Sequence, residues 1–224
     1  MTVPNNEKRD SRALEPELIK DPQARAEAEA RNGLRQYDAG IQAIQTALER
    51  PLFKLRPSLI LALHREALTG ISIFAGNFRP AGVQIQGSKH EPPGAHQVPE
   101  LVEDMCEYVN SHWDESTPLH LGAYIMWRLN WIHPFADGNG RTSRITSYVV
   151  LSVRAGALLP GTPTIPDQIV DNRQPYFDAL DAADAGYKAG KFDVSKMEDL
   201  LGTLLARQLA GFYEAAGGKI PSEP

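Results

Sequence analysis

Apolar residues recur every three to four positions along most of this chain, and prolines and glycines mark where the helical segments begin and end. Asp21-Pro22 has the form of an N-cap followed by proline at the first helical position, which predicts a helical segment over 22–49. Gly33 and Gly40 weaken that segment, so we expect two pieces or one bent helix. The same spacing predicts helices over 57–68, from Val98 onward, over 118–132, 139–155 and 175–188, and over 194–215 behind Asp193 as N-cap.

Residues 70–96 have a different character, because their many glycines and prolines exclude a long helix. Within them Val83-Gln84-Ile85-Gln86 alternates apolar and polar residues, which is strand spacing and predicts a short hairpin. A second proline- and glycine-rich stretch, after residue 155, predicts a link between helices. The expected fold class is therefore all-α: a compact helical bundle with a small β-hairpin.

The domain organisation follows from these patterns and from a composition close to the globular average, with 42% hydrophobic and 23% charged residues. We expect a flexible N-terminal arm over 1–20 and a helical segment over 21–50 that packs on the core. The main domain is expected over 51–216, and a C-terminal tail over 217–224.

The net charge, the apolar runs and the single cysteine limit which partners and which chemistry the sequence allows. Lys plus Arg number 23 against 28 Asp plus Glu, so the net charge of −5 excludes a whole-surface basic footprint, and we expect no nucleic-acid partner. The polar N-terminus and the lack of an apolar run of ~20 residues predict neither a secretory signal nor a membrane partner, and hence a cytoplasmic protein. Cys106 is the one cysteine, and its place beside the apolar stripe of the helix from Val98 predicts a packed thiol rather than a nucleophile.

The chemistry is concentrated between residues 133 and 144, where His-Pro-Phe-Ala-Asp-Gly-Asn-Gly-Arg-Thr-Ser-Arg joins two predicted helices. A Gly-Asn-Gly turn that opens a helix leaves backbone N–H groups free, which makes an anion cradle. Arg141 and Arg144 break two local rules, because cations are unfavourable at a helix N-terminus and like charges one turn apart repel. A bound polyphosphate would reverse both penalties.

Two further residues complete this candidate site. Asp137 can hold Mg²⁺ together with the phosphates, since one carboxylate suffices when the nucleotide supplies the other ligands. His133 offers a base that is usable at neutral pH. Each feature alone is more often purely structural, and only the combination within twelve residues favours a site.

Residues 133–144 resemble the signature of the Fic family, HPF-x-(D/E)-GNGR-x-x-R, at every fixed position. The resemblance extends over about 52–187, through Gly76-Asn77-Phe78-Arg79, which lead into the family's flap, and through 176–186, which close over the nucleoside. It implies that 51–216 is a Fic catalytic domain, a helical bundle with a flap. It also implies a protein adenylyltransferase, which moves AMP from ATP to a Ser, Thr or Tyr hydroxyl of a target protein and releases pyrophosphate.

The resemblance also implies roles by motif position. His133 would be the general base, and Asp137 would hold Mg²⁺ across the α- and β-phosphates. The implied nucleotide-binding set is Gly138, Asn139, Gly140, Arg141, Arg144, Phe177 and Asp184, with Arg141 on the departing pyrophosphate and Arg144 on the terminal phosphates. The implied flap that docks the target's main chain is Val83, Gln84, Ile85, Gln86 and Gly87. His90 matches no role in the chemistry, and we expect it to pack under the flap.

Two details refine the resemblance. Gly140 is present where the kinase-like Doc toxins have lysine, which favours nucleotidyl transfer over phosphoryl transfer. The family's inhibitory helix, (S/T)-x-x-x-E-(G/N), is matched poorly by residues 27–33, because Arg31 stands at the glutamate position and Glu29 is out of register. We expect this helix to pack on the core, and the enzyme to be constitutively competent, restrained differently, or restrained by a separate inhibitor or antitoxin protein.

Other functions remain open from the residues alone. The same site could transfer UMP, GMP, phosphocholine or phosphate, or could belong to a nucleotide-binding regulatory or toxin module with little activity. Neither the target protein nor the oligomeric state is predicted by the sequence.

Overall fold

The computed structural model describes residues 9, 11–12, 16 and 18–218, and eight α-helices account for most of that part of the chain. They are α1 (Pro22–Leu48), α2 (Pro57–Leu68), α3 (Val98–Ser111), α4 (Pro118–Ile132), α5 (Asn139–Ala155), α6 (Ile165–Asp171), α7 (Gln174–Lys188) and α8 (Ser195–Ala215). A 3₁₀ turn, η1 (Ala95–Gln97), precedes α3, and the strands are β1 (Ser11–Arg12) and β2 (Gln84–Ile85). The predicted all-α class is confirmed. The remainder of the predicted arm and tail lies outside the described residues.

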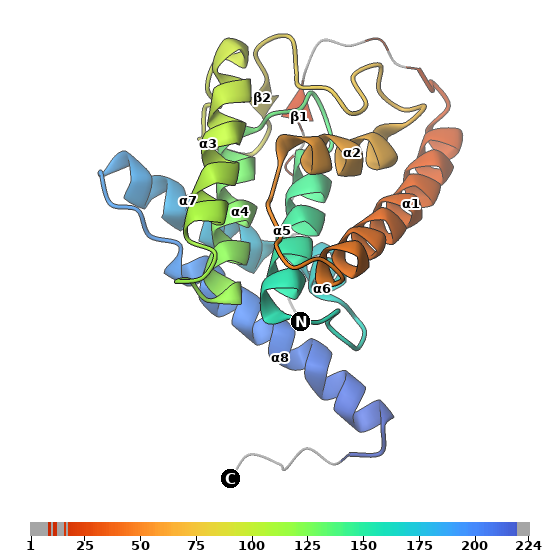
Figure 1. Cartoon of the computed structure of the whole chain (residues 1–224). Helices are drawn as coiled ribbons and strands as arrows, with labels where there is room; N and C mark the ends of the chain where they lie inside the picture. The colour runs from red at the N-terminus through yellow and green to blue at the C-terminus, as the bar shows by residue number, and fades with distance from the viewer. Residues whose placement is uncertain (1–8, 10, 13–15, 17, 219–224) are drawn as a thin grey trace, which may run out of the picture.

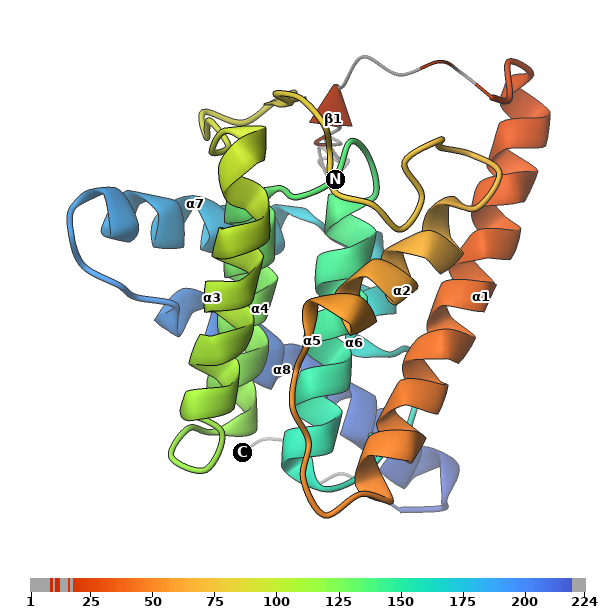
Figure 2. The same cartoon turned by 45° about the horizontal axis from the view of Figure 1, so that its top comes forward.

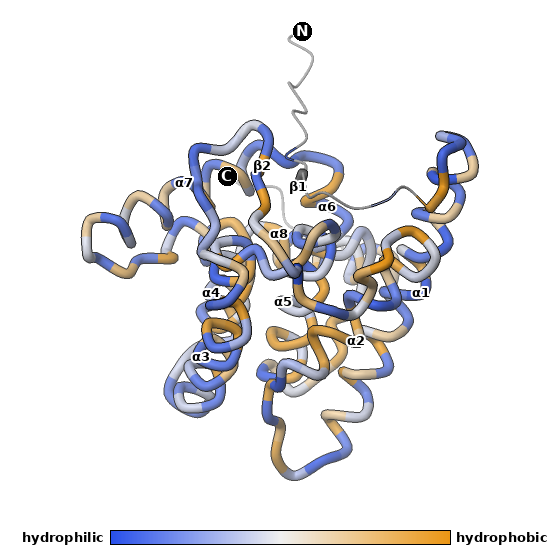
Figure 3. The backbone as a smooth tube through the Cα atoms, turned by 90° about the horizontal axis from the view of Figure 1, so that it is seen from above, coloured by the Kyte–Doolittle hydropathy of each residue, from blue (hydrophilic) through white to orange (hydrophobic). Residues whose placement is uncertain are grey.

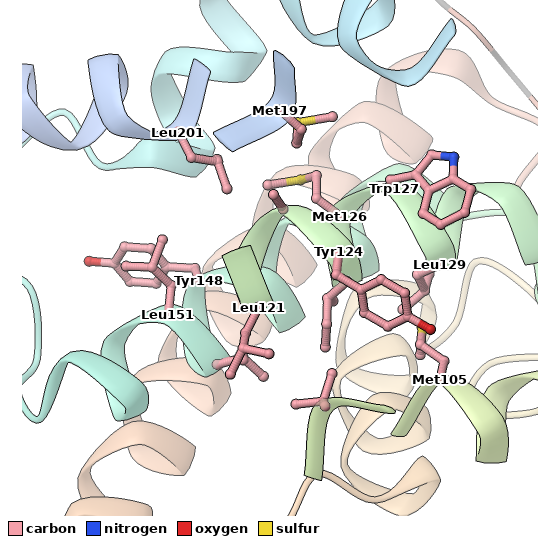
Figure 4. Packing of buried hydrophobic residues seen from close by; sticks show 14 of the residues in the cluster. Met105, Leu121, Tyr124, Met126, Trp127, Leu129, Tyr148, Leu151, Met197 and Leu201 are labelled. Carbon is pink, nitrogen blue, oxygen red and sulfur yellow. The ribbon is translucent and has the colours of Figure 1, made fainter. Parts of the chain in front are cut away.

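Helix α4 lies in the core, as its apolar sequence predicts. It packs against α5, α8 and α3, and α5 stands between α4 on one side and α1 and α2 on the other (Figures 1 and 2). Met126 and Tyr124 of α4 lie among side chains of the neighbouring helices, including Tyr148 of α5 and Leu201 of α8 (Figure 4). The Thr117 side chain accepts a hydrogen bond from the His120 amide and so fixes where this buried helix begins. At its other end, the last residue of the helix, Ile132, is fully buried.

Of the two forms predicted for the first segment, the two separate pieces are wrong, because α1 is one continuous helix of 27 residues. The predicted cap is confirmed, since the Asp21 carboxylate accepts from the Ala24 amide at 2.7 Å. Gly40 serves close packing: a Cβ there would lie 2.6 Å from Cδ1 of Ile145 on α5. Hydropathy alternates along α1 and α3, as in helices with one buried face (Figure 3). Helix α1 therefore lies directly against the helix that opens with the Gly-Asn-Gly turn.

The strand predicted within 83–86 is present at Gln84–Ile85, but its partner is not the adjacent segment of a hairpin. Gln84–Ile85 pairs antiparallel with Ser11–Arg12, in the register Ser11 to Ile85 and Arg12 to Gln84. The chain after Gly87 is instead held to α4, since Nε2 of His90 lies 2.7 Å from the carbonyl oxygen of Trp131. The free edge of β2 is thus covered by a segment more than seventy residues earlier in the sequence. Both strands lie over the N-terminal end of α5 (Figure 3).

The proline-rich link after α5 contains a short helix that the sequence analysis missed. Thr164 and Asp167 form a reciprocal capping box at the start of α6, and the Ile165 amide donates to Oε1 of Gln208 on α8 at 3.0 Å. The capping box and this contact with α8 stabilise a short helix in a segment whose prolines and glycines disfavour one. The predicted N-cap Asp193 is wrong, because α8 begins at Ser195 with Val194 as its N-cap, although the Asp193 carboxylate does accept from the Ser195 amide at 3.0 Å. None of the helices in the described ranges is long and apolar enough to cross a membrane.

Candidate functional site: the loop between α4 and α5

The loop from His133 to Gly138 begins with an unusual backbone conformation. His133 caps α4 with φ 50° and ψ 58°, the left-handed region that residues other than glycine rarely adopt. Buried Arg79 holds it there: its Nε–H donates to the His133 carbonyl at 2.7 Å, and its backbone N–H donates to the Pro134 carbonyl at 2.9 Å. The left-handed turn reverses the chain at the end of α4, so that the imidazole returns toward α5.

The His133 ring is buried, and its partners define its protonation. Nδ1 lies 3.2 Å from the carbonyl oxygen of Asn130, and because a carbonyl only accepts, Nδ1 carries the proton. Nε2 is then the unprotonated nitrogen, and it lies 2.7 Å from Oγ of Ser11. Burial lowers the pKa of His133 from 6.5 to about 4; the positive charge of Arg79 acts in the same direction, while the Asn130 hydrogen bond and Asp137 oppose it. The ring is therefore a neutral base at pH 7.

Asn139 fixes the shape of the loop. Its side chain accepts from the Phe135 amide and donates to the Phe135 carbonyl, both at 2.9 Å. This closes the loop on itself, so the amide group of Asn139 is committed to structure and to Ser11, from whose Oγ its Nδ2 lies 3.2 Å. Any contribution of Asn139 to an anion cradle comes from its backbone N–H.

The glycines on either side of Asn139 have different reasons for being glycine. Gly138 has φ 77°, and a Cβ there would lie 2.5 Å from Cδ2 of Leu68 on α2. At Gly140 a Cβ would lie 3.1 Å from Nη1 of Arg144, so glycine leaves room for that guanidinium. The α-helical hydrogen bonds of α5 begin with the Thr142 amide and the Gly138 carbonyl, so the amides of Asn139, Gly140 and Arg141 have no partner within the helix, while the Gly138 amide donates to Oδ1 of Asp137.

Arginines surround this helix start. A cavity of about 1120 Å³ is lined by His133, Gly138, Gly140, Arg141, Arg144 and Arg173, among others. Burial lowers the pKa of Arg144 from its ordinary value, and the positive charges of Arg173 and Arg141 act in the same direction, whereas Tyr176 opposes them. Nε of Arg173 is buried and, in the described part of the chain, has no hydrogen-bond partner. The cavity thus collects mutually repelling cations that an anionic ligand would stabilise.

Asp137 is the carboxylate of the site and is partly exposed. Its Oδ2 lies 3.4 Å from Nη2 of Arg141 and 3.5 Å from Nη2 of Arg25 on α1, and Nε of Arg25 also pairs with Glu29 at 3.2 Å. Among the described residues no group of three or more His, Cys, Asp or Glu side chains could hold a metal by itself. A single partly exposed carboxylate in a cavity suited to phosphates nevertheless fits Mg²⁺, which takes most of its ligands from nucleotide and water.

Some of the remaining predicted residues line the same cavity. Phe177 is buried on α7 and lines it together with Asp184, Ile85 and Gln86. Oδ1 of Asp184 accepts from the indole Nε1 of Trp127 at 2.8 Å, and its Oδ2 lies 3.8 Å from Nδ1 of His90.

Sequence reasoning missed residues that come from distant segments. His64 of α2 lies under the loop: its Nε2 is 3.0 Å from the Asp137 carbonyl, its Nδ1 accepts from the Gly76 amide at 2.9 Å, and its ring stacks on Phe135 at 3.7 Å. Arg25, Arg173 and Ser11 were missed too. No local sequence pattern connects any of these residues to 133–144, so there was no signal in the sequence by which to find them. Cys106 is buried as predicted, and burial raises the pKa of its thiol to about 12.

Comparison with known proteins identifies the domain. Residues 54–151 match the model of the Fic/DOC family. Protein adenylyltransferase Fic from Drosophila persimilis is 40% identical over 99 residues, which are 43% of this chain and 19% of that protein. Fic-1 from C. elegans has a similar fold, with a TM-score of 0.67 and 21% identity over 89% of this chain and 54% of that one. A Fic domain containing signaling protein from Bacteroides thetaiotaomicron gives a TM-score of 0.64 and 20% identity, covering 86% and 75%.

These matches cover only part of the curated relatives, and this limits what they establish. The chain spans about a fifth of the length of the first curated relatives that it matches, and the structural neighbours establish the fold. The matched residues 54–151 include the entire signature from His133 to Arg144. The region 54–151, which holds the whole signature, therefore matches the Fic/DOC family.

Proposed function

We propose that this protein transfers AMP from ATP to a Ser, Thr or Tyr hydroxyl of a protein and releases pyrophosphate. One observation carries the proposal: an unprotonated imidazole nitrogen of His133 lies at the same cavity as the start of α5 and five arginines, among them Arg141 and Arg144. A base for a hydroxyl and a cradle for phosphates are the two things that such a transfer requires. Curated relatives named protein adenylyltransferase support the choice of AMP.

The chemical step follows from the arrangement. As the target hydroxyl oxygen attacks the α-phosphorus, Nε2 of His133 takes its proton. The bond between that phosphorus and the bridging oxygen breaks, and pyrophosphate leaves with the electron pair. Arg141 and Arg144 offset the charge that accumulates on the departing pyrophosphate, while the first amides of α5 and Phe177 and Asp184 hold the rest of the nucleotide. The target's main chain would pair with β2 in the flap Val83–Gly87, along the edge that β1 covers in this structure.

Asp137 would hold Mg²⁺ beside the phosphates, and the ion would neutralise charge on them. When the nucleotide and ion bind, Oδ2 of Asp137 must exchange its contacts with Arg25 and Arg141. Both contacts are long, at 3.4 and 3.5 Å, so little stabilisation is lost in the exchange.

The decisive experiment follows the fate of each phosphate. Purified protein, Mg²⁺ and a cell lysate are incubated with ATP labelled either at the α- or at the γ-phosphate. Label on protein from α-labelled ATP alone is expected. Label from the γ-phosphate would indicate phosphoryl transfer, and stronger labelling with UTP or GTP another nucleotidyl group. Tight ATP binding without protein label would indicate a binding module.

The base is tested by substitution. His133→Ala should slow transfer by ~10²–10⁴-fold while ATP binding, measured by calorimetry, is largely kept. Exposed His96 is the matched control, and His96→Ala should transfer at the wild-type rate. Equal rates for wild type and His133→Ala would exclude the role.

A further inference from the structure

The strand that covers β2 brings a hydroxyl to the base. Ser11 pairs with Ile85, so β1 occupies the edge of the flap that a target strand would use. Its Oγ lies 2.7 Å from Nε2 of His133 and 3.2 Å from Nδ2 of Asn139. Since the proton of His133 is on Nδ1, the serine donates its O–H to Nε2, and the Asn139 amide donates to the serine oxygen. The hydroxyl is therefore held as a nucleophile would be held for deprotonation.

Arg9, two residues before Ser11, is held by α7. Both terminal nitrogens of Arg9 contact the Asp181 carboxylate, at 2.9 and 2.7 Å, and its guanidinium lies 4.5 Å from the centre of the Phe177 ring. The Arg9 side chain is 16% exposed, so this paired geometry is partly shielded from water. Two contacts therefore hold Ser11 between the flap and the start of α5: Arg9 binds Asp181 of α7, and β1 pairs with β2.

We propose that Ser11 is itself an acceptor of AMP, modified by the site of its own chain. The proposal rests on the adenylyl transfer proposed above and names a substrate for it. Oγ of Ser11 forms a bond to the α-phosphorus of ATP, its proton passes to Nε2 of His133, and the bond to the bridging oxygen breaks to release pyrophosphate. Nothing beyond ATP is consumed. Because the hydroxyl is on the same chain, the reaction is intramolecular, and its rate does not depend on collision with another molecule.

An acceptor serine and a strand that only blocks the site predict different effects of substitutions at position 11. A strand that only blocked the site would need no hydroxyl at Nε2, and any small residue at position 11 would serve. A substrate strand needs the oxygen, so threonine retains the reaction and alanine abolishes it. Once modified, Ser11 carries a phosphodiester, and the free O–H that donates to His133 no longer exists.

The test uses the full chain with α-labelled ATP and Mg²⁺, followed by proteolysis and mass spectrometry of the labelled peptide. The adenylyl group is expected on Ser11, with a first-order rate that is unchanged when the protein is diluted. Ser11→Ala should lose this label, and Ser11→Thr should keep it. Ser88 also lines the cavity, with Oγ accepting from the His90 amide at 3.2 Å, so Ser88→Ala is the matched control and should label as the wild type does.

The outcomes separate this proposal from the general function. If lysate proteins acquire AMP while Ser11 stays unmodified, Ser11 is a blocking residue, the proposal is overturned and adenylyl transfer stands. Label on another residue of the chain has the same meaning. A labelling rate that rises with protein concentration overturns the intramolecular step. No label on any protein from α-labelled ATP overturns both proposals.

Discussion

Arg79 and His133 are joined by a hydrogen bond of 2.7 Å from the guanidinium Nε to the backbone carbonyl of the histidine. The same guanidinium donates to the carbonyls of Ala81 and Pro93, on either side of β2. One buried side chain thus connects the segments on either side of β2 to His133, the proposed base. It also stabilises a left-handed residue, a conformation that costs roughly 1–2 kcal/mol outside glycine. We expect Arg79 to act as a positioning residue, because it reaches the imidazole through the backbone.

Arg79→Lys should therefore lower kcat for AMP transfer with little change in KM for ATP. Lysine keeps the charge but loses the planar fork that reaches three carbonyls at once, and a displacement of about 1 Å at the reacting atoms can cost ~10²-fold in rate. Steady-state kinetics and a urea melt are measured on each variant. Arg56 is exposed, so Arg56→Lys serves as control. A folded Arg79→Lys protein with wild-type kcat would remove the positioning role.

The pH profile of transfer tests the environment of His133. Its pKa is lowered from 6.5 to about 4 by burial, so the base stays deprotonated well below neutral pH. We expect kcat/KM for the target to show no decline near pH 6.5, and to fall only toward pH 4 as the free enzyme takes up a proton. Rates between pH 4 and 8 with a saturating metal concentration provide the measurement. An acidic midpoint at 6.5 would mean that the ring is open to solvent.

Acid should also destabilise the fold, and the sign follows from proton binding. His64 and His133 both have a pKa lowered from 6.5 to about 4, and in each case burial is the main cause. Between these values the unfolded chain binds protons that the folded chain does not, so stability is lost as pH falls from about 6.5 to about 4. Each histidine contributes a slope of up to ~1.4 kcal/mol per pH unit.

Urea unfolding at a series of pH values measures that slope. His64→Gln should flatten it between pH 6 and 5, because glutamine can still meet the Gly76 amide and the Asp137 carbonyl yet takes up no proton. His96→Ala should leave the slope unchanged, since His96 is exposed. An unchanged slope in His64→Gln would show that this ring titrates normally in the folded protein.

Much of the helical frame was predictable because local signals mark its ends. Pro57, Pro118 and Asn139 begin helices where expected, and Leu68, Ile132 and Ala155 end them as expected. Prediction failed where tertiary contacts decide the outcome. Gly40 suggested a break in α1, but the glycine is used for close contact with α5. The partner of β2 lies some seventy residues away, and alternation in one strand says nothing of which strand it meets.

The candidate site divides in the same way. Its loop could be predicted as a unit, because the base, the glycine turn and the arginines are contiguous from His133 to Arg144, and the structure brings them to one cavity. The residues that surround and orient this loop could not be predicted, since His64, Arg79 and Asn130 act through backbone carbonyls or through burial. Such contacts place no demand on spacing in the sequence. The pKa of His133 in particular is a property of the packed protein.

Gly33 and Gly40 form a natural pair for testing why α1 is continuous. Both lie inside the helix, but nothing lies within 4 Å of a Cβ at Gly33, whereas a Cβ at Gly40 would lie 2.6 and 2.8 Å from Cδ1 and Cγ1 of Ile145. Gly33→Ala should raise the free energy of unfolding by roughly 0.5–1 kcal/mol through helix propensity alone. Gly40→Ala gains the same propensity but should be destabilising overall, by about 1–3 kcal/mol, because α1 must move away from α5. Urea melts of the two variants decide it, and a stabilising Gly40→Ala would mean that Ile145 adjusts freely and that α1 is not held against α5 by this contact.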